Sequence, residues 1–176
     1  PSQDMVLGIY YLTQERPDSL GEGHYFKNLN EAILAYENGY VKLHSRIHVR
    51  VTKKMADGTE KTGTVESTLG RFIFNEILPQ DLGFVDRSIP ENDLVLEVDF
   101  HVGKKGLKQI LEKVINIHGA TTTAEVLDDI KAMGYKYSTR AAMTVSISDM
   151  TVPASKPKLI ADAQATVDHI AKNFRR

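Results

Sequence analysis

Alternation of polar and apolar side chains over residues 41–51 constrains the fold most. The apolar set is Val41, Leu43, Ile47, Val49 and Val51. The polar set is Lys42, His44, Arg46, His48 and Arg50. Because successive side chains of a strand point to opposite faces, this period of two predicts a half-buried β-strand. Asp57-Gly58 is a hairpin-turn signal, so residues 61–65 are predicted to be the returning strand.

Helical spacing flanks this predicted hairpin on both sides. Before it, the stretch MVLGIYY repeats apolar side chains at helical spacing, and a second helix is predicted over about 28–38. Asn28 and Glu31 have capping-box spacing there, and Gly39 supplies a left-handed stop. After the hairpin, LGRFIFNEILP predicts a third helix that ends at Pro79.

The chain from Lys104 onward is predicted to be mostly helical. One apolar stripe ends at Gly119 and consists of Leu107, Ile110, Leu111, Val114 and Ile115. Thr122 is predicted to open the next helix and Gly134 to stop it. A last stripe over 160–174 predicts a helix that has neither Gly nor Pro after it, which favours a chain cut from a longer one.

Two stretches between these helices carry less signal. Residues 80–90 show no period and are predicted to form a loop, whereas LVLEVDFHV over 94–102 is predicted to be extended. The fold class is therefore α+β. A small mixed helix and β-hairpin part is expected over residues 1–103, followed by a mostly helical part over 104–176.

Composition excludes several classes of protein. A hydrophobic share of 41% and a charged share of 26% are ordinary for a soluble globular chain of 176 residues. The net charge of −1 creates no bulk attraction to nucleic acid or to anionic membranes. The absence of Cys excludes disulfides and thiolate zinc sites, and no apolar run approaches the roughly 18 residues of a membrane span. These features predict a cytoplasmic protein without membrane contact.

No metal site or self-contained catalytic set is predicted. His44 and His48 would share one face of a strand about 13 Å apart, which is too far for one ion. Asp128 and Asp129 are adjacent on a predicted helix, so their carboxylates diverge. The sequence contains neither a G-x-S-x-G nucleophile elbow nor a G-x-x-x-x-G-K-[ST] phosphate loop.

Basic residues form the candidate binding sites. Lys42, Arg46 and Arg50 on the predicted strand could attract phosphates or partner carboxylates, but a water-facing side of an amphipathic strand is the commoner explanation. Lys104 and Lys105 within GKKG could hold a phosphate at a helix start, although such lysines are more often simply solvated.

The stretch GYKYSTRAAMTVSISDM, residues 134–150, is rich in small residues. Small residues permit close backbone approach to a neighbour, which favours a packed interface. A plain irregular connector fits the same stretch equally well.

Four stretches together resemble the largest subunit, β′, of bacterial DNA-directed RNA polymerase. They are PSQDMVLGIYYLT, LGRFIFNEILP, VGKKGLKQIL, and GYKYSTRAAMTVSISDM followed by TVP. They occur in the order of that family and span nearly the whole chain. The resemblance implies a pore domain followed by the start of a funnel domain. These domains line the secondary channel, through which nucleoside triphosphates enter and backtracked RNA leaves.

The resemblance also implies where the chemistry lies. In that family the Mg²⁺-binding motif N-A-D-F-D-G-D lies upstream of PSQD, and this sequence lacks it. Because two-metal nucleotidyl transfer needs those carboxylates, the chain alone is expected to be inactive, without a cofactor of its own. Mg²⁺ and zinc are expected elsewhere in the parent polymerase.

The expected partners are those of an RNA polymerase. They are the β, α, ω and sigma subunits, the DNA template, RNA, nucleoside triphosphates, and transcript-cleavage or other secondary-channel factors. Transcription is therefore the expected process.

Residue roles follow from matching motifs. Gln3 and Asp4 match the P-S-Q-D of the family and are expected nearest the active centre, and Lys104 and Lys105 are further channel candidates. Arg71 is expected to be a buried ion-pair anchor rather than a pore-lining charge. The remaining matches to charged residues of the family are Arg140 and Asp149.

Several positions depart from the family. Ala142 and Ser146 replace glycines, and Ser148 replaces an Asp. A guanosine tetraphosphate site of some relatives would fall on Thr121, Asp128 and Ala132. Only the acid is retained, so this site is predicted not to bind the alarmone well. The stretch 86–95 is expected to be an insertion.

The sequence leaves two other functions open. One is a stand-alone nucleic-acid-binding module that uses the basic face over 42–50, for which a steep salt dependence of binding is expected. The other is a small metal-dependent phosphohydrolase, which Mg²⁺-dependent nucleotide hydrolysis would support. A near-null result is expected in both assays.

Overall fold

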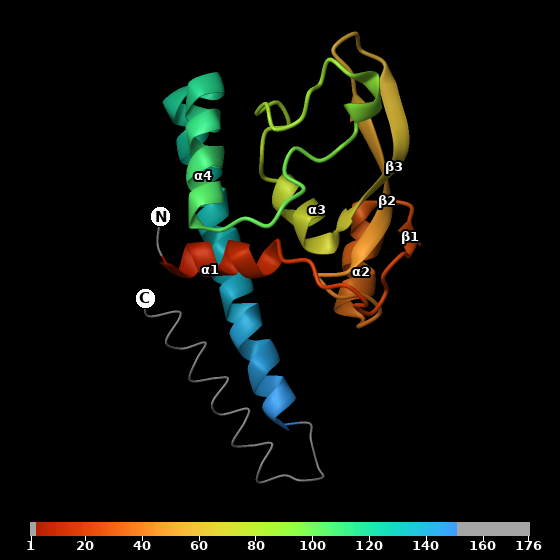
Figure 1. Ribbon diagram of the computed structural model, residues 1–176, viewed down its shortest axis with the longest axis vertical. Coiled ribbons are helices and arrows are strands. Elements are labelled where there is room, and N and C mark those ends of the chain that lie inside the picture. The colour runs from red at the N-terminus through yellow and green to blue at the C-terminus, as the bar shows by residue number, and fades with distance from the viewer. Residues whose placement is uncertain (1–2, 151–176) are drawn as a thin grey trace.

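The computed structural model describes residues 3–150, and it combines a small sheet with helices (Figure 1). The elements in chain order are α1 (Gln3–Leu12), β1 (Tyr25–Phe26), α2 (Leu29–Glu37), β2 (Arg46–Lys54), β3 (Glu60–Thr68), α3 (Leu69–Asn75), a 3₁₀ turn (Pro90–Asn92) and α4 (Lys104–Met150). The predicted α+β class is confirmed.

The sheet is built on the predicted hairpin. Strands β2 and β3 are antiparallel, from Arg46 opposite Thr68 to Lys54 opposite Glu60, and the short β1 is parallel to β2. Gly58 closes the turn with a φ of 88°, a left-handed conformation that glycine adopts without strain. Strand β2 begins later than the alternation, because residues 41–45 form a turn instead, which is buried except for Lys42.

The helix predicted over about 28–38 is confirmed at both ends, whereas the third helix ends at Asn75 and not at Pro79 as predicted. The side chain of Asn28 accepts a 2.8 Å hydrogen bond from the backbone N–H of Glu31, as an N-cap does. Gly39 follows helix α2 with a φ of 83°. Thr68 caps α3 in the same way by accepting a 3.2 Å bond from the N–H of Arg71.

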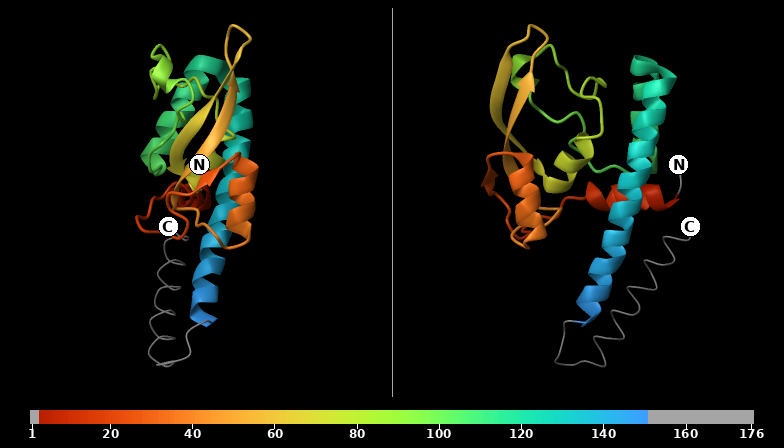
Figure 2. Two further views of the ribbon diagram at one scale, coloured as in Figure 1. Left: turned by 90° about the vertical axis from the view of Figure 1, so that its right-hand side faces the viewer. Right: turned by 180° about the vertical axis from the view of Figure 1, so that it is seen from behind.

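Helix α4 is two helical limbs joined at Gly119, whose φ of 86° is left-handed. The first limb covers residues 104–118 and the second covers 120–150. The chain turns back at Gly119, so that the two limbs lie side by side (Figures 1 and 2). The predicted helix start at Thr122 and stop at Gly134 are both wrong, because both residues lie inside the second limb.

The core is one cluster to which every major element contributes. Its fully buried side chains include Met5, Ile9, Leu12, Ile47, Val49, Leu69, Phe74, Leu107, Ile110 and Ile130. Helix α1 runs across the second limb of α4 (Figure 1). The division of the chain into parts at residue 103 stays a prediction.

Residues 94–102, predicted to be extended, form no strand. Polar side chains hold this segment instead. The helix predicted over 160–174 lies outside the described residues. Within residues 3–150, no helix is long and apolar enough to cross a bilayer.

Candidate functional site at the helix α1 junction

Helix α1 carries the two residues expected nearest an active centre. Gln3 and Asp4 form its first turn, with Asp4 exposed and Gln3 half-buried. An acidic side chain there interacts favourably with the positive end of the helix dipole. The opposite face of the helix buries Met5, Ile9 and Leu12. The candidate site is therefore the first turn of α1, and the rest of this helix is packed into the core.

The middle of α1 touches the second limb of α4 backbone to backbone. A Cβ atom placed on Gly8 would lie 1.8 Å from the carbonyl oxygen of Gly134. A Cβ atom placed on Gly134 would lie 2.7 Å from both Cα and O of Met5. Real Cβ atoms essentially never come this close to backbone, so glycine at both positions permits the crossing.

A second close contact holds the other end of α1. A Cβ atom on Gly70, in the first turn of α3, would lie 1.8 Å from the carbonyl oxygen of Leu12. Helix α1 therefore lies against α4 at its middle and against α3 at its end. We call residues 3–13 together with Gly70 and Gly134 the α1 junction.

Two histidines cap the last turn of α1. Nε2 of His101 lies 2.8 Å from the carbonyl oxygen of Tyr10, and Nε2 of His44 lies 2.8 Å from that of Tyr11. Because a carbonyl can only accept, Nε2 must carry the proton and donate in both pairs. These bonds satisfy carbonyls that have no partner within the helix.

His44 is buried, with 5% of its surface exposed, and its ring packs edge-on against Tyr11. Burial lowers the pKa of His44, although the hydrogen bond to the Tyr11 carbonyl opposes that shift. The expectation that His44 faces water on the strand is therefore wrong. It precedes β2 and serves as a neutral helix cap.

Arg71 anchors the same end of α1 from α3. Its Nε donates to the carbonyl oxygen of Thr13 at 3.0 Å. One terminal nitrogen lies 3.2 Å from Glu15 and 3.4 Å from Asp99. Only 6% of the residue is exposed. Arg71 is thus a buried ion-pair anchor within the fold.

Arg46 shares the carboxylates of this network. Its guanidinium lies 3.0 Å from Glu15, 3.2 Å from Glu66 and 3.4 Å from Asp99. Burial alone would lower the pKa of Arg46, but these three acids together raise it. Ser67 also donates to Asp99 at 2.6 Å. The positive charge of Arg46 is therefore balanced by carboxylates of the chain itself.

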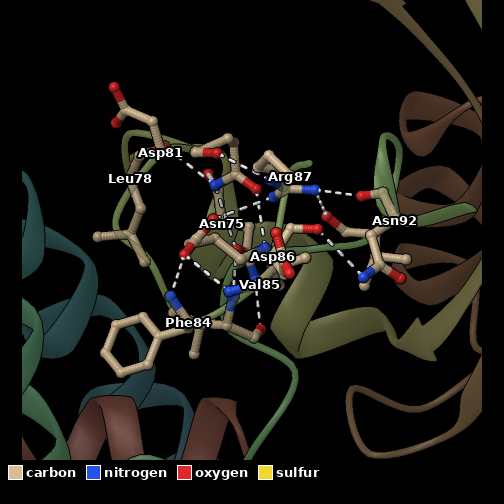
Figure 3. Close-up of polar contacts among 12 residues, drawn as sticks. Asn75, Leu78, Asp81, Phe84, Val85, Asp86, Arg87 and Asn92 are labelled. Atoms are coloured by element: carbon tan, nitrogen blue, oxygen red, sulfur yellow. Dashed lines mark hydrogen bonds and ion pairs between the residues drawn. The ribbon is translucent and has the colours of Figure 1, made fainter. Parts of the chain in front are cut away.

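The loop between α3 and α4 is held by a network of polar side chains (Figure 3). Glu97 has no exposed side-chain surface and pairs with Arg87 at 3.1 Å. The same carboxylate accepts 2.7 and 3.3 Å bonds from the N–H groups of Phe84 and Val85. Arg87 also donates to the carbonyl oxygens of Gln80, Asn92, Asp93 and Val95. A buried carboxylate thus organises an irregular segment.

Asn75 and Gln80 complete this network. The amide of Asn75 donates to the carbonyl oxygens of Arg71 and Val98 and accepts from the N–H of Val98, all within 3.0 Å. Gln80 accepts from the N–H of Glu97 at 3.0 Å. We call Asn75, Gln80, Arg87 and Glu97 the loop network. Arg87 lies in the stretch expected to be an insertion, 86–95, and binds the carbonyl oxygens of Asn92, Asp93 and Val95 there.

Comparison of the sequence with known protein families gives a match over most of the chain. The model of the family described as RNA polymerase Rpb1, domain 3, matches residues 1–150. The chain belongs to this family.

Individual relatives of this Rpb1 domain 3 chain are named DNA-directed RNA polymerase subunit beta′. The chain is 68% identical to the protein of Lachnoclostridium phytofermentans, 53% to that of Acetivibrio thermocellus and 51% to that of Clostridium acetobutylicum. All 176 residues are covered in each comparison, and the chain spans 14–15% of the length of these relatives. The resemblance to β′ is confirmed.

The predicted basic face is not continuous in this Rpb1 domain 3 chain. Lys42 and Arg50 are exposed, but Arg46 lies between them within the ion-pair network. His48 stacks on Tyr25 with ring centroids 4.2 Å apart and planes 9° apart. Lys42 also lies in the turn before β2 and not on the strand.

The remaining candidate residues are dispersed. Lys104 and Lys105 are exposed in the first turn of α4. Arg140 donates to the hydroxyl of Tyr36 at 3.1 Å and lies over its ring, so it ties the second limb to α2. This hydrogen bond raises the pKa of Arg140. The side chain of Asp149 lies outside the described residues.

Positions that depart from the family remain predictions. Thr121, Asp128 and Ala132 are all exposed on the second limb. Ala142 is half-buried there, whereas the side chains of Ser146 and Ser148 lie outside the described residues. Within residues 3–150, no group of three or more potential ligands gathers where it could hold a metal ion.

Proposed function

We propose that the chain forms the part of an RNA polymerase β′ subunit that walls the secondary channel. Nucleoside triphosphates would enter, and backtracked RNA would leave, past this wall during transcription in the cytoplasm. The observation that carries this proposal is the match of the whole chain to β′ subunits, at 68% identity for one of them. The chain's own contribution is positioning rather than chemistry.

The contacts of the charged residues support a non-catalytic role. Three residues are of types that can act as acids or bases or bind phosphate, but all three are engaged in ion pairs. They are Arg71, Arg46 and Glu97. A nucleotidyltransferase needs carboxylates that clamp Mg²⁺, and those are expected elsewhere in the parent. The chain alone is therefore expected to polymerise nothing.

The expected partners follow from this assignment. They are the β, α, ω and sigma subunits, the DNA template, RNA, nucleoside triphosphates and factors that enter the secondary channel. A stand-alone nucleic-acid-binding module has less support, because Arg46 in the middle of its basic face already contacts three carboxylates. A phosphohydrolase has no supporting feature among residues 3–150.

Photo-crosslinking in an assembled polymerase tests the proposal. A photoreactive amino acid replaces Gln3 in the full-length β′ subunit, and elongation complexes are backtracked so that the RNA 3′ end enters the channel. A matched variant carries it at Lys54, which is exposed and is the last residue of β2. The tip that joins β2 to β3 lies far from the start of α1 (Figure 1). We expect a crosslink to RNA from position 3 and none from position 54. Equal yields from both positions would contradict the channel assignment.

A further inference from the structure

We propose that Gly134 is a positioning residue for the polymerase active centre. By allowing the second limb of α4 to touch the backbone of α1, it sets the position of the turn that carries Gln3 and Asp4. This inference rests on the proposed function, because it assumes that this turn faces the reacting nucleotides. It adds a residue on α4 that acts through α1 and touches no substrate.

The contact geometry makes the effect local to that turn. The nearest atoms to a Cβ on Gly134 are Cα and O of Met5, at 2.7 Å, and its carbonyl carbon at 3.1 Å. Met5 directly follows Asp4 in the first part of α1. Carbon atoms pack at about 3.5–4.0 Å, so an alanine methyl group would displace the Met5 backbone by roughly 1 Å.

The rest of α1 cannot absorb this displacement. Its far end is fixed by the close contact between Gly70 and Leu12 and by the Nε bond of Arg71 to Thr13. His44 and His101 bind two further carbonyls of that end. A push at Met5 therefore displaces the first turn of the helix, which contains Met5 and carries Gln3 and Asp4.

Gly134 could instead be needed only for packing. A packing role predicts that any core change of similar cost affects the polymerase equally. A positioning role predicts that only changes under the first turn of α1 slow nucleotide addition. Val49 provides the matched control, because it is fully buried on β2 and contributes to the same core cluster.

Single-nucleotide addition by the assembled polymerase separates these roles. The parent, Gly134→Ala and Val49→Ala β′ subunits are assembled with their partners, and rates are measured by rapid quench over a range of nucleotide concentrations. We expect Gly134→Ala to lower the maximal rate about 10- to 100-fold, the range that a misplacement of about 1 Å produces. Apparent nucleotide affinity should change little, because base pairing to the template is untouched. Val49→Ala should retain a maximal rate within about twofold of the parent.

Two results would overturn the inference. One is an unchanged maximal rate in Gly134→Ala, and the other is an equal loss in Val49→Ala. If Gly134→Ala does not assemble, Ile130→Ala takes its place. Ile130 is fully buried one helical turn before Gly134, so its truncation loosens the same face without a clash. A lower maximal rate in Ile130→Ala but not in Val49→Ala supports the inference. Equal maximal rates in these two variants contradict it.

The two proposals can fail separately. Absence of the crosslink from position 3 removes the channel assignment whatever the rates are. A crosslink together with an unaffected rate in Gly134→Ala removes only the positioning role.

Discussion

The α1 junction and the loop network each hold one segment of the chain against the rest of the fold, but they do so by opposite means. At the junction, Gly8 and Gly134 bring two backbones together with no side chain between them. In the loop network, the buried carboxylate of Glu97 gathers Arg87 and backbone N–H groups around itself. The junction is therefore expected to fail when an atom is added, whereas the loop network is expected to fail when a partner is removed.

Adding one methyl group to the junction is the largest expected effect. Gly8→Ala places Cβ 1.8 Å from the Gly134 carbonyl oxygen, and both atoms belong to packed helices. Overpacking typically costs about 1–3 kcal/mol, and this clash with backbone is expected to exceed both that range and the loss from any side-chain truncation considered below. Urea unfolding followed by circular dichroism measures it.

Gly106→Ala is the matched control for that experiment. It makes the same chemical change in the first limb of α4, where Cβ would lie at an ordinary 3.4 Å from Val102. Alanine is a better helix former than glycine, so this variant should gain up to about 1 kcal/mol. A similar loss in both variants would refute the backbone-contact account.

Removing one partner from the loop network is expected to cause the second-largest loss of stability. Glu97→Ala leaves the Arg87 guanidinium without its carboxylate and two N–H groups without an acceptor. Breaking a buried pair in this way costs about 3–5 kcal/mol, and the lower end is expected here because the Arg87 side chain is 22% exposed. The double variant Arg87→Met/Glu97→Leu should recover part of that loss, which the same unfolding experiment detects. A Glu97→Ala variant within about 1 kcal/mol of the parent would be incompatible with the network.

Acidification should weaken the junction through His44. Burial lowers the pKa of His44 below the value of about 6.5 that it has when unfolded. The unfolded chain therefore binds the proton first, and stability declines as the pH falls through 6.5 towards the folded pKa. His44→Gln keeps an N–H donor for the Tyr11 carbonyl and should flatten this part of the profile. His24→Gln, at an exposed histidine that caps no helix, should keep the slope of the parent, and a loss of slope there would count against His44 as its source.

The smallest effect is expected at the edge of the loop. Lys61 and Asp93 pair at 2.9 Å, but the lysine side chain is 42% exposed. Exposed pairs contribute about 0–1 kcal/mol, so Asp93→Asn should stay within that range and lose its effect at high salt. A loss as large as that of Glu97→Ala would show that burial does not distinguish the two pairs.

Features whose partners are close in sequence could be predicted. The hairpin turn at Asp57-Gly58 and the cap of Asn28 on Glu31 depend on residues a few positions apart. Gly134 was predicted to end a helix, because a lone glycine gives no sign of a partner. Its actual role depends on Gly8 and Met5, at the other end of the chain.

The same reason explains the other residues whose position or role the sequence did not predict. His44 continued the alternation of the strand, and only the position of Tyr11 makes it a helix cap. Arg87 and Glu97 lie in stretches without helical period, so their buried pairing had no sequence signal. The motif match did indicate Arg71 as an anchor, although not its acceptors.

Crosslinking from position 3 in parent and Gly134→Ala polymerases tests the central claim most directly. That claim is that a backbone contact on α4 fixes the end of α1 beside the RNA 3′ end. The account predicts an RNA crosslink in the parent, a clearly lower yield in Gly134→Ala, and an unchanged yield in Val49→Ala. Identical yields from the parent and Gly134→Ala would contradict it.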